Sequence, residues 1–266
     1  MVFVATLWWL KTEALYRYVV LVFRNGETMK ELMLPVTEYH TIVKAEGPLD
    51  VCLSQIKSAK AVPVSGEQLA VARVYNGEES EICRKGCWLV GYDEIRLNNG
   101  DLLMTLPKQS VILENPRKAV ATHRTGNCIY LTQKQLEARM ERASTDLTKA
   151  REGGVLRIPK NKMASKIPTN KYGEIIETQF VYGAEAKTYG DFLYQKKIES
   201  SENYVGDTDS KGAVACGLWV HYLDSTSSLN DDYYIIVNLS LGRVFGVQNV
   251  PAKRIAPKTP LETLVK

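Results

Sequence analysis

Residues 85–106, with the sequence KGCWLVGYDEIRLNNGDLLMTL, decide the expected class of fold. Trp88–Tyr92, Ile95–Leu97 and Leu102–Leu106 are short apolar runs. Residues 98–100, NNG, separate the last two runs with side chains that favour turns. Short runs at this spacing predict antiparallel strands in a sheet or a small barrel.

The same alternation of apolar runs and turn residues continues on both sides of this stretch. An Asn-Gly pair at residues 25–26 predicts a hairpin turn, because both residues tolerate positive φ angles. Tyr189–Ile198 favours either a short helix or a strand. The remaining predicted strands are Tyr16–Phe23, Lys30–Leu34, Leu69–Tyr75, Val111–Leu113, Glu174–Tyr182, Gly217–Leu223, Tyr233–Leu239 and Arg243–Val247.

Two segments have helical periodicity instead. Apolar residues after Pro48 recur at helical spacing and predict a short helix from Leu49 to about Lys60. In the centre of the chain, Thr132 and Gln135 form a capping-box pattern ahead of a narrow apolar stripe. The glycine pair at residues 153–154 ends that stripe, so we expect one amphipathic helix over about residues 133–152.

These elements predict a β-rich α+β fold, in which mainly antiparallel sheets or a small barrel flank the central amphipathic helix. With 266 residues and a 45% hydrophobic composition, the chain is long enough for one or two packed cores. We expect a β-rich lobe with one short helix at residues 1–115, a basic segment at 116–171, a second β-rich lobe at 172–250 and an extended C-terminal strap at 251–266. The basic segment would hold the central helix and an exposed arm.

Charge is unevenly distributed along the chain. Residues 116–171 carry 13 Lys and Arg against 4 Asp and Glu, although the net charge of the whole protein is +4. Clustered cations neutralise phosphates and release counterions, so this segment predicts contact with nucleic acid or with an acidic protein surface. The cations expected to make the contact are Arg139, Arg142, Lys149, Arg151, Arg157, Lys160, Lys162, Lys166 and Lys171.

Two other interpretations of the basic segment remain open. The cations either solvate the outer face of the protein, or pair with carboxylates of the flanking regions or of a neighbouring subunit. No aromatic residue lies between Leu131 and Lys171, which argues against a platform for stacking single-stranded bases.

Five cysteines suggest two alternative sites. Cys83 and Cys87 have C-x₃-C spacing, and together with His123 and Cys128 they offer the thiolates and imidazole that zinc prefers. Ordinary buried cysteines explain the same residues, so we expect no metal and no other cofactor. The odd number and irregular spacing of the cysteines favour a reducing compartment, cytoplasmic or otherwise intracellular, or the inside of a virion.

A thiol hydrolase is the alternative function. Cys128, His221 and Asn238 occur in the chain order of a papain-like enzyme, in which an imidazole takes the thiol proton and an amide orients the ring. Cys128 precedes the predicted helix cap at Thr132, and this is not the helix N-terminus that acidifies such nucleophiles.

The apolar N-terminal run and the extended C-terminal strap both predict protein contacts. Trp8 and Trp9 lie in an apolar N-terminal run that is too short to cross a membrane and that has no signal-peptide pattern. Paired tryptophans are common at subunit interfaces, and so an interface role is expected here. The sequence also lacks the motifs of phosphate-binding loops, zinc peptidases and serine hydrolases.

Taken together, these features predict a non-enzymatic component of a larger assembly, viral or nucleoprotein in kind. Its partners would be other protein subunits, and its basic segment would contact either nucleic-acid phosphate or an acidic protein surface. No membrane partner is expected.

Overall fold

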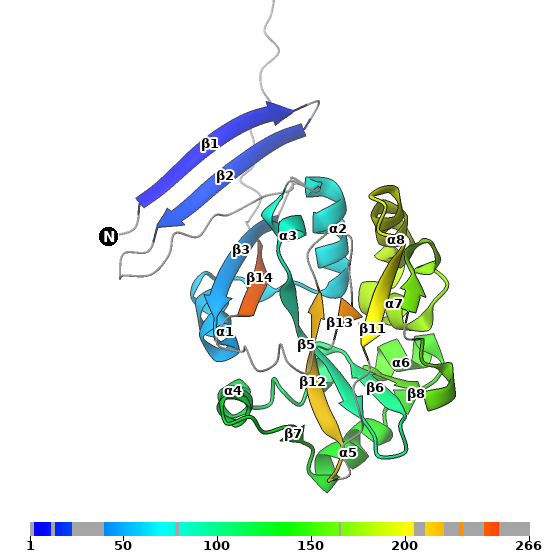
Figure 1. The fold of residues 1–266 in the computed structure, drawn as a ribbon. Helices are drawn as coiled ribbons and strands as arrows, with labels where there is room; N and C mark the ends of the chain where they lie inside the picture. Colours follow the sequence, from blue (N-terminus) through cyan, green and yellow to red (C-terminus); the bar gives the residue numbers. More distant parts are fainter. Residues whose placement is uncertain are drawn as a thin grey trace, which may run out of the picture.

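The computed structural model describes residues 3–11, 14–22, 40–77, 80–164, 166–204, 211–220, 229–230 and 242–249. Within these ranges the chain forms an α+β fold in which a 9-stranded sheet is the largest element. The expected fold class is therefore confirmed. Figure 1 shows this sheet in the middle of the molecule, with helices around it.

Four antiparallel strands form the centre of the large sheet, in the order β12 (Val214–Val220), β5 (Cys87–Arg96), β6 (Leu102–Thr105) and β9 (Val155–Ile158). The predicted hairpin is the β5–β6 pair, in which Glu94 lies opposite Met104. Gly100 has a φ of 86°, which only glycine adopts freely, so the NNG turn forms as the sequence predicts. Trp88–Tyr92 and Ile95–Leu97 merge into the single strand β5.

Short strands extend the sheet on both sides. Beyond β9, β8 (Ala143–Ser144) pairs in parallel. On the other side follow β13 (Leu229–Asn230), β11 (Ser200–Tyr204) and β10 (Lys166–Pro168), while β7 (Ile129–Tyr130) pairs with the start of β12. The predicted segments 1–115, 116–171 and 172–250 thus all supply strands to one sheet, rather than forming separate lobes.

A smaller sheet has the order β3 (His40–Gly47), β14 (Gly242–Asn249) and β4 (Val62–Pro63). α1 (Leu49–Ser58) packs on β3 and β14 and buries Leu49, Cys52 and Ile56, which confirms the helix predicted after Pro48. The predicted strand Arg243–Val247 is part of β14, but it pairs with β3 rather than with β12.

The N-terminal strands β1 (Phe3–Lys11) and β2 (Ala14–Val22) pair antiparallel. Strand β2 matches the predicted strand at Tyr16–Phe23. The Asn25-Gly26 turn, the return strand Lys30–Leu34, the strand Tyr233–Leu239 and the strap 251–266 lie outside the described residues.

Three predicted strands are wrong. Leu69–Tyr75 lies in α2 (Gly66–Asn76), because Ser65 and Gln68 form a capping box and the buried residues follow helical spacing. Glu174–Tyr182 contains α7 (Ile176–Tyr182), which packs on α2. Val111–Leu113 forms no strand, since the amides of Val111 and Ile112 donate to the Asp93 carboxylate instead of to a neighbouring strand.

The predicted central helix is two helices. α5 (Gln133–Met140) begins with the expected Thr132–Gln135 capping box, but ends before β8. α6 (Leu147–Gly153) has its own cap, because the Asp146 side chain accepts a hydrogen bond from the Lys149 amide. Gly154 then ends α6 in the left-handed conformation.

The predicted exposed arm is wrong at its start. Val155, Leu156 and Ile158 are buried in β9, where they pair with β6 inside the large sheet. Ile167 and Thr169 are buried as well. The lysines between and around them are exposed, on two 3-10 turns and on β10, so the segment alternates between buried anchors and exposed cations.

A close contact joins α8 (Ala186–Gln195) to the turn at residues 169–172. A Cβ atom added at Gly190 would lie 2.6 Å from Cβ of Tyr172 and still closer to the Thr169 carbonyl oxygen. Tyr172 and Tyr189 are both buried within this contact. The absence of a side chain at Gly190 therefore sets the distance between α8 and the turn.

We predict that Gly190→Ala destabilises the protein by about 1–3 kcal/mol, because overpacking a tight contact has this cost. Alanine is the better helix former by about 1 kcal/mol, so propensity alone predicts the opposite sign. Urea unfolding measures the difference. Thr188→Ala, at an exposed position of the same helix, is the matched control and should be neutral or slightly stabilising.

Candidate functional site

Three of the nine predicted contact cations are held by carboxylates of the protein itself. Arg151 pairs with Glu67, and Arg139 pairs with Glu114. Arg157 contacts Asp101 at 2.6 Å, and this hydrogen bond lowers the pKa of the Asp101 carboxyl. These three arginines are therefore not available as an uncompensated surface, contrary to the prediction.

Arg139 is a structural residue. Its side chain is buried, its Nε donates to the Gln109 carbonyl at 3.0 Å, and its Nη1 donates to the Gln135 carbonyl at 3.2 Å. Together with the Glu114 pair, these bonds fix α5 against residues 109–114. Replacing such an arginine removes packing and several charge-assisted bonds at once.

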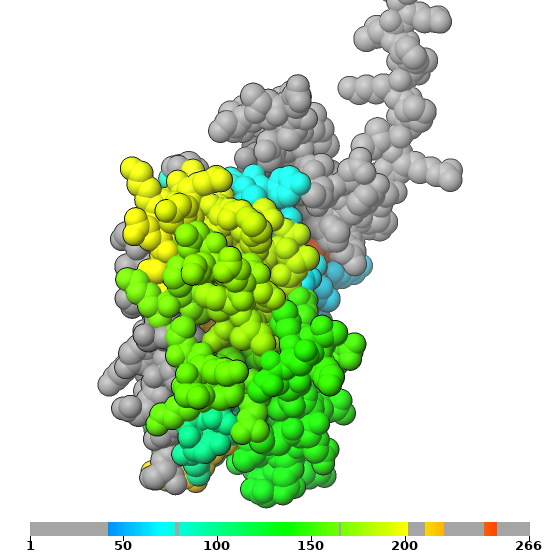
Figure 2. Space-filling view, turned by 90° about the vertical axis from the view of Figure 1, so that its right-hand side faces the viewer, coloured from blue at the N-terminus to red at the C-terminus, as the bar shows by residue number. Residues whose placement is uncertain are grey.

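The other six cations are exposed: Arg142, Lys149, Lys160, Lys162, Lys166 and Lys171. We call these residues the basic surface. Within the described parts of the chain, none of the six forms an ion pair. Figure 2 views the side of the molecule on which the green to yellow-green segments, which include these residue numbers, are exposed.

Several short elements present the basic surface. Lys149 lies on α6, Lys166 on β10, and Lys160 and Lys162 on the 3-10 turn Lys160–Lys162. The backbone amide of Lys160 donates to Asp101 at 3.1 Å, so this turn is anchored to the β5–β6 hairpin. Lys160, Lys162 and Lys166 thus project from positions that the sheet fixes.

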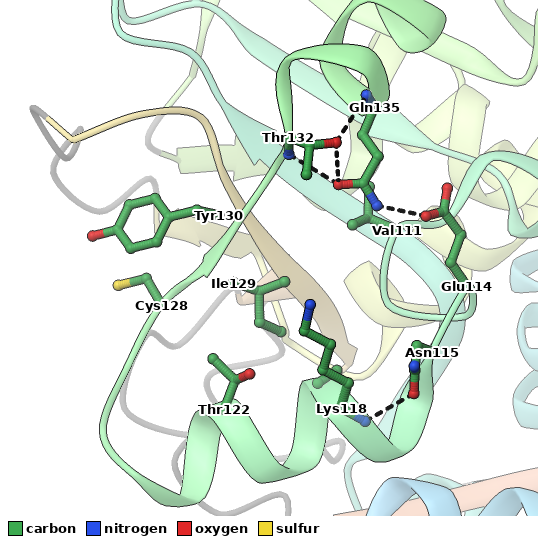
Figure 3. A pocket seen from close by; sticks show the side chains of 11 residues that line it. Val111, Glu114, Asn115, Lys118, Thr122, Cys128, Ile129, Tyr130, Thr132 and Gln135 are labelled. Atoms are coloured by element: carbon green, nitrogen blue, oxygen red, sulfur yellow. Dashed lines mark hydrogen bonds between the residues drawn. The ribbon is translucent and has the colours of Figure 1, made fainter.

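A cleft of about 470 Å³ lies between α4 (Pro116–Arg124), β7 and the start of α5. In Figure 3, Cys128 and Tyr130 project from one side of β7, whereas Ile129 projects from the other side. Most polar groups of the cleft already have partners: Asn115 caps α4, and Gln135 bonds both Thr132 and Glu114. Helix caps therefore preform this cleft.

The hydrolase hypothesis has its cysteine in this cleft. Cys128 is partly buried in the segment before β7, which is not a helix N-terminus. His221 and Asn238 lie outside the described residues, so the triad stays a prediction.

The four candidate zinc ligands are not brought together. Cys83 and Cys87 lie in one core cluster, whereas Cys128 packs against another. The Cys83 thiol lies 3.4 Å from the Arg73 carbonyl, and burial raises the pKa of Cys87 to about 11. His123 is buried on α4. Among the described residues, no three His, Cys, Asp or Glu side chains are grouped so that they could hold a metal ion.

Trp8 and Trp9 lie on β1, where they pair with Arg17 and Tyr16 of β2. Their side chains lie outside what the structure describes, so the interface role stays a prediction. No described helix combines the length and the apolar character that crossing a bilayer requires.

Sequence reasoning missed a group of buried charges on β5. Asp93, Glu94 and Arg96 are all buried, and Glu177 of α7 is buried too. Burial raises the pKa of Asp93 to about 6, although Ile112, Ser110 and Val111 donate hydrogen bonds to its carboxylate. The signal in the sequence was the run DEIR inside an otherwise apolar strand.

Comparison with known proteins bears on the fold. No family model and no curated protein matches the sequence. One solved structure, described as "Accommodation of massive sequence variation in Nanoarchaeota by the C-type lectin fold", is similar over 81% of this chain and 100% of that chain. The TM-score is 0.55 and the sequence identity 12%. The likeness shows that this chain has an α+β fold similar to the C-type lectin fold.

We predict that Glu94→Gln removes a pH dependence of stability. Burial raises the pKa of Glu94 to about 7, and the nearby Glu177 adds to this effect. An unfolded chain releases this proton near its ordinary pKa of 4.5, so the stability of the native protein falls as the pH rises from about 5 to 7. The variant keeps up to about 3 kcal/mol of stability that the native protein loses over this range.

Urea unfolding at pH 5 and pH 8 measures this difference. Glu174→Gln, at an exposed position, is the matched control and should follow the native protein. If the Glu94 variant lost as much stability between the two pH values as the control, the buried carboxyl would not titrate in this range.

Proposed function

We propose that the protein is a non-enzymatic component of a larger assembly and that its basic surface contacts an acidic partner. The supporting observation is the state of the six cations, which are exposed and form no ion pair with described carboxylates. An exposed cation without an internal partner retains its full charge for an external anion.

The number of exposed cations favours a polyanion over a small acidic ligand, and it sets the expected dependence of affinity on salt. A protein that neutralises about six phosphates loses roughly a thousandfold in affinity between about 50 and 200 mM salt. Five of the six residues are lysines, which act as flexible point charges toward phosphate. Contacts of this type position a partner without reading its sequence.

The fold supports a binding role. The Nanoarchaeota structure is described as one in which the C-type lectin fold accommodates massive sequence variation. A framework of that kind suits a protein whose activity depends on exposed side chains rather than on a fixed catalytic centre. The basic surface of this chain fits the same logic, because the buried strand β9 leads into the turn that carries Lys160 and Lys162.

Charge reversal tests the proposal. We expect Lys160→Glu, Lys162→Glu and Lys166→Glu together to weaken binding to a short DNA duplex by at least about tenfold at low salt, and to reduce the slope of log affinity against log salt by about three. Fluorescence anisotropy at several salt concentrations measures both quantities.

The matched control carries Lys57→Glu, Lys60→Glu and Lys197→Glu, three exposed lysines outside the basic segment that likewise form no ion pair with described carboxylates, with the same change in net charge. Equal loss in both variants would show that only the total charge matters, and would remove the basic surface as a site. If neither protein binds the duplex, a pull-down with an acidic protein column distinguishes a protein partner from no partner at all.

A further inference from the structure

Two cysteines far apart in the sequence meet across the edge of the large sheet. Strand β7 pairs antiparallel with β12, with Tyr130 opposite Val214 and Ile129 opposite Ala215. The next position in the same register places Cys128 opposite Cys216. Both cysteines are in the thiol form in the structure.

The hydrogen-bond pattern defines the kind of pair they form. The Leu131 amide donates to the Ala213 carbonyl at 3.0 Å, so Leu131 and Ala213 are a hydrogen-bonded pair. Pairs alternate along an antiparallel ladder, which makes Cys128 and Cys216 a non-hydrogen-bonded pair. The Cα atoms of such pairs lie about 4.5 Å apart, with their side chains close together.

Residues directly opposite in an antiparallel ladder lie on the same face of the sheet, and two further observations agree with this arrangement. Cys216 belongs to a core cluster that also includes Val214, and Cys128 packs against that cluster. The Cys128 thiol also contributes to the electrostatic environment of the Cys216 thiol. The spacing of about 4.5 Å between Cα atoms falls inside the range of about 4.4–6.8 Å that a disulfide spans.

We propose that Cys128 and Cys216 form a dithiol site that a small-molecule disulfide converts into a cross-strand disulfide. The Cys128 thiolate attacks the reagent, forms one S–S bond and releases one reagent thiol. The Cys216 thiolate then attacks Cys128, forms the internal S–S bond and releases the second reagent thiol. Two protein thiols are oxidised, one reagent disulfide is reduced to two thiols, and the two protons pass to solvent or to the released thiolates.

The cleft determines the order of the two steps. Cys128 lines the cleft and is partly exposed, whereas only 1% of Cys216 is exposed. The reagent therefore meets Cys128 first, and Cys216 resolves the mixed disulfide. Because Cys128 and Tyr130 form one wall of the cleft, the internal disulfide would fasten this wall to β12.

The resolving step should depend strongly on pH. Burial raises the pKa of Cys216 to about 12, with Arg96 opposing this effect and Glu94, Cys128 and Asp93 adding to it. Below that pKa, the thiolate fraction of Cys216 rises about tenfold per pH unit. We therefore expect closure of the mixed disulfide to accelerate by about tenfold between pH 7 and pH 8.

The experiment treats the folded full-length chain with oxidised glutathione, blocks the remaining thiols with iodoacetamide and maps peptides by mass spectrometry. We expect one cross-link, between the peptides that contain Cys128 and Cys216, and its loss after treatment with dithiothreitol. A mixed disulfide that persists on Cys128 at pH 8, or a cross-link to any other cysteine, would overturn the proposal.

Three variants make the result specific. Cys128→Ser should abolish the cross-link, and Cys216→Ala should leave glutathione attached to Cys128. Cys52→Ser, at a buried cysteine of the same core cluster, is the matched control and should retain the cross-link. If Cys216→Ala does not fold, Cys128→Ser and the peptide map of the native protein still decide the question.

Discussion

The antiparallel ladder between β5 and β12 is the constraint on which the rest of the structure depends. All ten residues of β5 are buried, so its partners must cover it on both edges and both faces. β6 and β9 extend one edge, while β12 covers the other and carries β7 and the cleft with it. A register shift at Gly217 and Leu218 adapts β12 to the irregular path of β5. This pair of strands therefore positions the cleft beside β7 and, through β6 and β9, the turn that carries Lys160 and Lys162.

Burying all of β5 also dictates how its charges are accommodated. Asp93 accepts hydrogen bonds from Ser110 and from two backbone amides, and this network shapes the turn before α4. Glu94 has a carboxylate oxygen without a hydrogen-bond partner among the described residues, and burial raises its pKa accordingly. A carboxyl in such a place is kept neutral more easily than charged. Burial thus favours the protonated form of the Glu94 carboxyl on β5 and of the Cys216 thiol on the neighbouring strand β12.

Local signals in the sequence predicted local structure well. The NNG turn, the helix after Pro48 and the Thr132 capping box all form as expected, since each depends on a few neighbouring residues. The strand predicted at Leu69–Tyr75 was wrong, because a capping box and packing against α7 favour a helix there. The pairing of β7 with β12 involves residues distant in the chain, so no pattern in a single sequence indicated that Cys128 lies beside Cys216. The basic segment was visible as a sum of charges, but its internal ion pairs were not.

Those ion pairs divide the cations of the basic segment into two groups. The forked guanidinium groups of Arg139, Arg151 and Arg157 bind carboxylates from other parts of the chain. The five lysines and Arg142 are instead exposed to solvent. From β12 to β9 the sheet crosses three strand spacings, or about 14 Å. This exceeds the Debye length of about 8 Å at physiological salt. Oxidation of two neutral thiols beside β12 changes no charge, so it leaves the potential at Lys160 and Lys162, which follow β9, unaltered.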